Sequence, residues 1–155
     1  IYINIRRLNA NGVAISDLEN YCTSVAALVH PGDYFTITSL QKDGFSHPLD
    51  ETGFDNWFFA SVLAEDHSHF FVRRMGKTKL FYRGHKMFSL LDFLRWLLEP
   101  TGKMDIFELY ELLEQQYGLL IDRSKILETI RTSDLYYDSI MEAAYIDYDT
   151  YFEEV

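Results

Sequence analysis

The sequence is poor in cysteine, with Cys22 as the only one among 155 residues. A single thiol cannot close a disulfide within the chain and offers no cysteine pair to a metal, so we expect a protein of the reducing cytoplasm. Long apolar runs are missing as well, since uncharged stretches such as 25–29 are far shorter than the roughly 20 residues of a membrane span. No glycine-rich phosphate loop and no nucleophile elbow occurs. The sequence therefore points away from secreted disulfide domains, membrane spans and common catalytic motifs.

What the chain does contain is typical of a folded protein. Hydrophobic residues make up 48% and aromatic residues 16%, with 12 Phe, 11 Tyr and 2 Trp. Large aromatic side chains bury much area, so one domain or two small ones can each build a core. Residues 1–15 begin without Met and lack the apolar run and cleavage site of a signal peptide. We expect them to be the N-terminal segment of a longer parent chain.

Charge is distributed unevenly along the chain. The 14 Lys and Arg and the 24 Asp and Glu give a net charge of -10, which on average argues against a general polyanion binder. Up to Lys86 nine basic residues balance nine acidic ones, whereas five basic residues face fifteen acidic ones after it. Six cations fall within fourteen residues that contain no acid: Arg73, Arg74, Lys77, Lys79, Arg83 and Lys86. The acidic segment after Arg131 has no Lys or Arg, so it repels phosphate and suits a basic protein partner or plain solvation.

Residues 16–86 carry a recognisable order of helical and extended patterns. Ser16 and Asp17 precede the first apolar stripe, and Pro31-Gly32 ends it. Thr36 and Asp55 are expected as N-caps of the next two helices. The expected elements are a helix over 18–29, a short strand at 34–35, helices over 37–40 and 57–63, and a hairpin of strands 70–74 and 79–83.

Residues 87–155 repeat this order. The expected elements are a helix over 90–98, an extended residue at 104, helices over 106–113 and 126–130, and strands 135–137 and 144–146. Five residues of the first part match five of the second at one constant offset of 69: Pro31, Phe35, Thr36, Ile37 and Leu40 match Pro100, Met104, Asp105, Ile106 and Leu109. The pair Phe54-Asp55 matches Ile121-Asp122 at an offset of 67. This recurrence predicts a duplicated unit.

Both halves resemble the winged-helix superfamily of helix-turn-helix domains, and the second half resembles its HARE type more closely. The predicted fold is α+β, mainly helical, with two tandem winged-helix-like units of helix, strand, helix, helix and β-hairpin. We expect the boundaries to be 1–15 for the N-terminal segment, 16–86 for copy 1, and 87–155 for copy 2 with its acidic end. The resemblance implies binding of double-stranded nucleic acid as the commonest role, with protein interaction as a frequent alternative.

The first wing is the predicted nucleic-acid site, because the presumed third helix over 55–66 offers only Asn56 as a donor to base edges. The predicted contacts to the DNA backbone are weak and nonspecific, and they come from the six wing cations: Arg73, Arg74, Lys77, Lys79, Arg83 and Lys86. The alternative is a β-ribbon that Lys and Arg merely solvate and protect from aggregation at its edges.

In the second copy Arg123 and Lys125 are predicted as secondary contacts to phosphate or to a partner protein. Glu128 and the acidic wing would oppose nearby DNA, and Lys125 can alternatively pair with Glu128 along the helix. We therefore expect a basic protein partner for this copy. The whole chain is predicted to be a non-catalytic tandem winged-helix module of a larger regulatory or nucleic-acid-processing protein. The alternative is a purely protein-interaction module without nucleic-acid binding.

Other residues with reactive side chains do not define a site in the sequence. His67 and His69 stand two apart and His47 precedes them; such a pair can hold zinc, but a polar turn explains it equally well. Cys22 lies on an apolar helix stripe, which is typical of a small core residue. The aromatic run 57–59 is typical of core, although exposed aromatic rings can stack on bases. We expect no cofactor, no metal and no catalytic residue.

Overall fold

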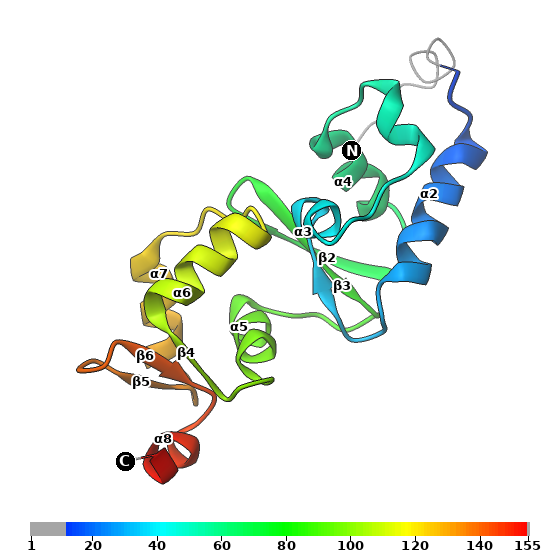
Figure 1. Cartoon of the computed structure of the whole chain (residues 1–155). Helices are drawn as coiled ribbons and strands as arrows, with labels where there is room; N and C mark the ends of the chain where they lie inside the picture. Colours follow the sequence, from blue (N-terminus) through cyan, green and yellow to red (C-terminus); the bar gives the residue numbers. More distant parts are fainter. Residues whose placement is uncertain (1–11, 155) are drawn as a thin grey trace. The chain divides into compact units, whose positions relative to one another are not determined.

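The computed structural model describes residues 12–154, so most of the predicted N-terminal segment, residues 1–11, lies outside the described residues (Figure 1). The chain is α+β, with more residues in helices than in strands and with two antiparallel three-stranded sheets. Residues 12–72 and 79–86 form one compact unit, and residues 73–78 and 87–154 form the other. The tip of the first hairpin, 73–78, therefore belongs to the second unit.

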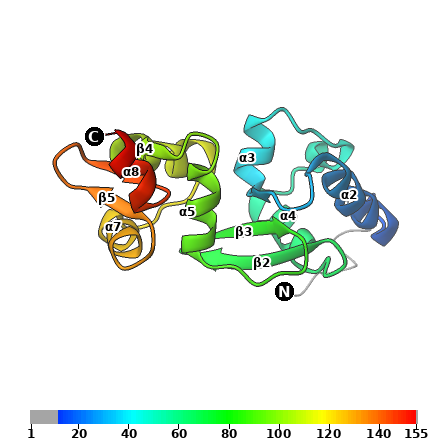
Figure 2. The same cartoon turned by 90° about the horizontal axis from the view of Figure 1, so that it is seen from below.

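The elements between Ile15 and Arg83 follow the predicted order. They are α2 (Ile15–Leu28), β1 (Tyr34–Phe35), α3 (Ile37–Lys42), the 3-10 helix η1 (Pro48–Thr52), α4 (Asn56–Ala64), β2 (Phe70–Met75) and β3 (Thr78–Arg83). The strand order in the sheet is β1-β3-β2, and β2 and β3 lie side by side (Figure 2). Thr36 and Asp55 are the N-caps of α3 and α4, which confirms both predictions.

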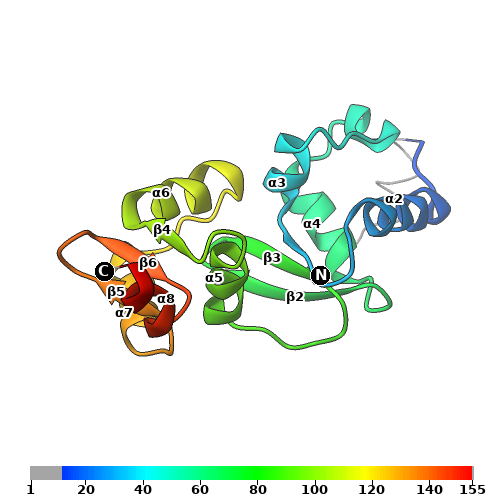
Figure 3. The same cartoon turned by 60° about the horizontal axis from the view of Figure 1, so that its bottom comes forward.

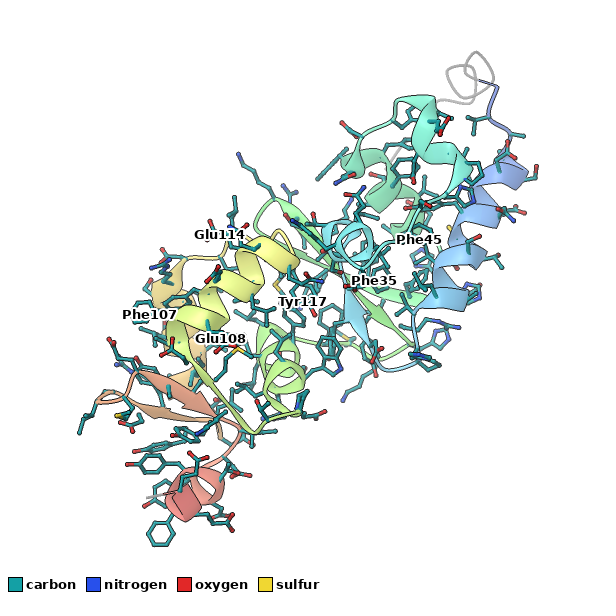
Figure 4. All side chains as sticks on the ribbon, viewed as in Figure 1. Phe35, Phe45, Phe107, Glu108, Glu114 and Tyr117 are labelled. Carbon is teal, nitrogen blue, oxygen red and sulfur yellow. The ribbon has the colours of Figure 1, made fainter. Side chains whose placement is uncertain are left out.

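The core of the first unit is built from aromatic and aliphatic side chains of α2, α3, α4 and the sheet. The rings of Phe35 and Phe81 stack with centroids 5.2 Å apart, where their strands pair. Tyr21 is 2% exposed, and burial followed by the nearby Asp50 charge raises the pKa of its hydroxyl. Phe35 lies in this core and Phe45 packs against it (Figure 4).

The elements from Leu90 onward repeat the order of the first set. They are α5 (Leu90–Leu98), β4 (Lys103–Asp105), α6 (Ile106–Glu111), the π-helical turn η2 (Leu112–Gln116), α7 (Arg123–Arg131), β5 (Tyr136–Asp138), β6 (Ala143–Tyr145) and α8 (Tyr148–Glu154). Ser89, Asp105 and Asp122 are the N-caps of α5, α6 and α7. The strand order β4-β6-β5 reproduces that of the first sheet. The fully buried side chains of this unit include Phe93, Leu94, Leu98, Leu109 and Ile130.

Two local expectations differ from the structure. The first helix begins at Ile15 with Ala14 as N-cap, so Ser16 lies inside it; the carboxylate of Asp17 accepts a hydrogen bond of 2.8 Å from the Ala14 backbone N–H. The acidic end also forms a helix, α8, which lies beside the β5–β6 hairpin (Figure 3). Three aromatic residues of this helix stand at helical spacing: Tyr148, Tyr151 and Phe152.

Candidate nucleic-acid interface

Two of the six predicted wing cations are held within the first unit. Lys79 and Arg83 are half-buried on β3, on the same face as the core residue Phe81, because side chains alternate along a strand. The Lys79 ammonium lies 4.5 Å from the centre of the Trp57 ring. The Arg83 guanidinium donates to the carbonyl oxygen of Ala26 at 3.4 Å.

The other four predicted cations are exposed: Arg73, Arg74, Lys77 and Lys86. The first three lie at the hairpin tip, which belongs to the second unit, whereas Lys86 belongs to the first. The tip is attached by Thr78, whose hydroxyl donates to the carbonyl oxygen of Gly118 at 3.0 Å. The cations of the tip are therefore presented next to the second unit's own helices.

A hollow of about 460 Å³ opens beside this tip, within the second unit. We call it the tip hollow; its walls are the hairpin tip, the start of α5 at Ser89–Leu91, and the segment from Leu120 to the first turns of α7. The charged side chains that line it are Arg73, Arg74, Asp122 and Lys125. Three cations thus face one carboxylate in a unit whose net charge is negative.

Internal partners leave most of this positive charge available. Among residues 12–154, Arg73 and Lys125 have no hydrogen-bond or ion-pair partner through their side chains, and Lys125 forms no ion pair with Glu128. The intrahelical pair that the sequence allowed is therefore not formed. Arg74 donates from Nε to the carbonyl oxygen of Gly76 at 2.9 Å, which holds its guanidinium at the tip.

The single carboxylate of the tip hollow has a structural role. Asp122 caps α7, and its carboxylate accepts hydrogen bonds from the hydroxyl of Ser124 at 2.8 Å and from the Ser124 backbone N–H at 3.0 Å. These bonds, that from the hydroxyl first, hold the pKa of Asp122 below its usual value. The charge lies at the positive end of the α7 dipole, which offsets it in part. Asp122 weakens the attraction of the tip hollow for anions without cancelling it.

Gly76 permits the close approach of the tip to the α7 start. Its φ is +63°, and a Cβ atom at this position would lie 3.4 Å from the carbonyl oxygen of Leu120. Glycine adopts this left-handed conformation without the steric cost that other residues meet. Leu120 itself is 75% exposed and lines the tip hollow, a role that no pattern in the sequence indicated.

Arg123 and Lys125 were predicted together as secondary contacts, but they line different hollows. The guanidinium carbon of Arg123 lies 4.8 Å from the centre of the Tyr110 ring, and both residues line a hollow of about 310 Å³ together with Glu114. Lys125 lines the tip hollow instead. An anion in the tip hollow would therefore meet Lys125 rather than Arg123.

In α4, the third helix of the first copy, few side chains could donate hydrogen bonds to base edges. The side-chain amide of Asn56 is paired with that of Gln41, with N–O distances of 2.9 and 3.3 Å. Trp57 is 49% exposed, whereas Phe59 is in the core. The aromatic run is thus partly core, as the sequence favoured, with Trp57 as its exposed member.

Two histidines, His47 and His69, hold local structure. His47 is the N-cap of η1, its Nδ1 accepting from the Leu49 backbone N–H at 3.1 Å. His69 Nδ1 lies 2.8 Å from an oxygen of Asp66. Within residues 12–154 no three or more His, Cys, Asp and Glu side chains are grouped so that they could hold a metal ion.

Cys22 lies in the core of the first unit, at 9% exposure, as its place on the α2 stripe indicated. Burial, reinforced by the Asp66 charge, raises the pKa of its thiol to about 12. The thiol therefore stays protonated at neutral pH, and a thiolate nucleophile is disfavoured.

In the described part of the chain no helix has both the length and the apolar character to cross a membrane. Comparison of the sequence with models of protein families, with curated proteins and with solved structures finds no match.

Proposed function

We propose that the chain is a non-catalytic tandem winged-helix module of a larger regulatory or nucleic-acid-processing protein. In this proposal it binds the phosphate backbone of double-stranded DNA at the tip hollow. The first hairpin supplies Arg73 and Arg74, with Lys77 beside them at the tip, and the third helix of the second copy supplies Lys125.

The topology of the two units supports a winged-helix arrangement. In each unit the short strand after the first helix pairs with the second strand of the hairpin, which gives the orders β1-β3-β2 and β4-β6-β5. The third helices α4 and α7 both begin after a capping Asp. Helix, strand, helix, helix and hairpin is the order in which winged helices place a third helix and a wing against DNA.

The observation that carries the binding proposal is the convergence of Arg73, Arg74 and Lys125 on one hollow. Guanidinium groups bind phosphate oxygens with two parallel hydrogen bonds, and a lysine ammonium adds a mobile point charge. The net charge of -10 opposes the approach of DNA, so we expect an affinity on the order of 10⁻⁴ to 10⁻⁶ M at physiological salt, in the nonspecific range.

Single charge reversals test this proposal through the anisotropy of a fluorescein-labelled DNA duplex titrated with the chain at several salt concentrations. Arg73→Glu and Lys125→Glu should each weaken binding by about tenfold, which corresponds to about 1.4 kcal/mol. Each should also reduce the slope of log affinity against log salt by about 0.9, since one phosphate contact is lost. Lys42→Glu is the matched control, because Lys42 is exposed on α3 and its reversal changes net charge by the same amount.

The proposal fails if the wild-type chain does not bind the duplex at low salt. It also fails if Lys42→Glu weakens binding as much as Arg73→Glu, since the effect would then reflect net charge alone. In either case the protein-interaction module without nucleic-acid binding takes its place.

A further inference from the structure

The turn between β5 and β6 exposes two large apolar side chains. Ile140 is 89% exposed and Met141 is 69% exposed. Apolar side chains grouped on a surface mark sites where another molecule binds, because their burial removes apolar area from water. Single exposed apolar residues need no explanation, so their neighbours decide whether these two form a site.

The backbone of this turn is held in place by hydrogen bonds. The carboxylate of Asp138 accepts from the backbone N–H groups of Ile140 at 2.9 Å and of Met141 at 3.3 Å. Glu142 has a φ of +51°, the left-handed region, and its carbonyl oxygen accepts from the Ile106 backbone N–H at 2.8 Å. The turn is therefore connected to the start of α6 and presents its apolar side chains from a fixed backbone.

The start of α6 adds a third apolar side chain, Phe107, which is 51% exposed. Phe107 follows Ile106 and Met141 precedes Glu142, so each is one residue from the hydrogen bond that joins the two segments. Figure 4 labels Phe107 and Glu108 in this first turn of α6. We call Phe107, Ile140 and Met141 the apolar turn surface.

Carboxylates stand next in sequence to the residues of the apolar turn surface. The neighbouring carboxylates on α6 and the hairpin are Asp105, Glu108, Asp138 and Glu142. Arg131, the last cation of the sequence, is positioned over the ring of Tyr137, with its guanidinium carbon 5.1 Å from the ring centre. Arg123 is positioned over the ring of Tyr110, which contacts the Phe107 ring at 6.0 Å between centroids. An apolar centre with an acidic border complements a positively charged partner with apolar side chains and repels the phosphates of nucleic acid or anionic lipid.

We infer that the apolar turn surface docks a short basic, amphipathic segment of a partner protein. The partner's apolar side chains cover Phe107, Ile140 and Met141, and its Lys and Arg side chains face the neighbouring carboxylates. This surface shares no residue with the tip hollow, so the inference is independent of DNA binding.

A defined peptide tests the inference on the whole chain. The probe is a fluorescein-labelled synthetic helix of Leu and Lys with one apolar face, followed by anisotropy at physiological salt. The chain should bind it, and Ile140→Ser should weaken binding by about tenfold, as expected for a residue at the centre of an interface. Phe152→Ser is the matched control, because Phe152 is a 65% exposed apolar side chain on α8, outside the surface. We expect this variant to bind the peptide within about twofold of the wild-type affinity, since substitutions far from a binding site change affinity little.

A second pair of variants tests the acidic border. Glu108→Gln should weaken peptide binding, whereas Glu114→Gln, which removes another exposed carboxylate in the following turn η2, should not. A peptide of Leu and Glu with the same pattern should not bind. The inference is overturned if the Leu–Lys peptide fails to bind, or if Phe152→Ser and Glu114→Gln weaken binding as much as Ile140→Ser and Glu108→Gln.

Discussion

The same N-cap position is built from different residues in the two units, and burial explains the choice. Thr36 is completely buried and Ser39 is 2% exposed. The Ser39 backbone N–H donates to Thr36 Oγ1 at 3.0 Å, and the Thr36 backbone N–H donates to Ser39 Oγ at 2.8 Å. In the second unit the cap is the exposed Asp105, which accepts from the Phe107 N–H. A hydroxyl can be buried in a hydrogen-bonded cap, whereas burying an ionised carboxylate costs far more.

Removing the buried hydroxyl should therefore destabilise the first unit. Thr36→Val keeps the shape but leaves the Ser39 N–H without its partner, so we expect a loss of about 1–2 kcal/mol in the free energy of unfolding. Urea unfolding followed by Trp57 fluorescence in a Trp96→Phe background measures it, because Trp57 and Trp96 are the two tryptophans of the chain. Thr38→Val, on the same helix, is the control and should cost less; equal losses would show that the cap hydroxyl is dispensable.

At the scale of elements, the helices that the sequence predicted have apolar stripes and capping residues that act locally. Leu40 and Leu109, matched in the sequence, are both buried on the second helix of their units. α8 was missed although Tyr148, Tyr151 and Phe152 stand at the i, i+3 and i+4 spacing of a helix. The carboxylate of Asp147 also caps its first turn by accepting from the Thr150 backbone N–H at 2.7 Å. Tertiary contacts add to this local pattern, since the Tyr151 ring lies 4.3 Å from that of Tyr136 and 5.2 Å from that of Tyr145.

These ring contacts predict unequal effects of two substitutions in α8. Tyr151→Ala removes contacts with two rings of the hairpin and should lower the stability of the second unit by about 1 kcal/mol, the scale of one to two aromatic pairs. Phe152→Ala also removes an aromatic ring, but among residues 12–154 the ring near it is that of Tyr148 in the same helix, 6.1 Å away. Chemical denaturation of both variants measures the difference. If the two unfold with the same midpoint, the tyrosine contacts do not hold α8 in place, and the acidic end is a solvated tail.

At the scale of the whole molecule, the sequence predicted part of the candidate site and missed its completion. Six cations in fourteen residues identified the first wing, and Arg73, Arg74 and Lys77 are exposed at its tip. The addition of Lys125 depends on the placement of the tip against residues some forty positions further on, such as Gly118. Contacts at such separation follow from tertiary packing, which neither periodicity nor charge counting along the chain describes.

The assignment of residues 73–78 to the second unit predicts that a cut after Lys86 damages that unit. The fragment 87–155 loses the hydrogen bond from Thr78 to Gly118 and the tip residue Met75, which is 7% exposed in the whole chain. Burial of a methionine side chain contributes roughly 1.5–3 kcal/mol, so we expect the fragment to be less stable than the same unit in the whole chain by about 2 kcal/mol. Trp96 fluorescence reports this unit alone in the fragment, and also in the whole chain once Trp57→Phe is introduced. The same urea midpoint in both would mean that the hairpin tip contributes nothing to the second unit, and the tip hollow would then lose the rigid wall on which the proposed phosphate contacts depend.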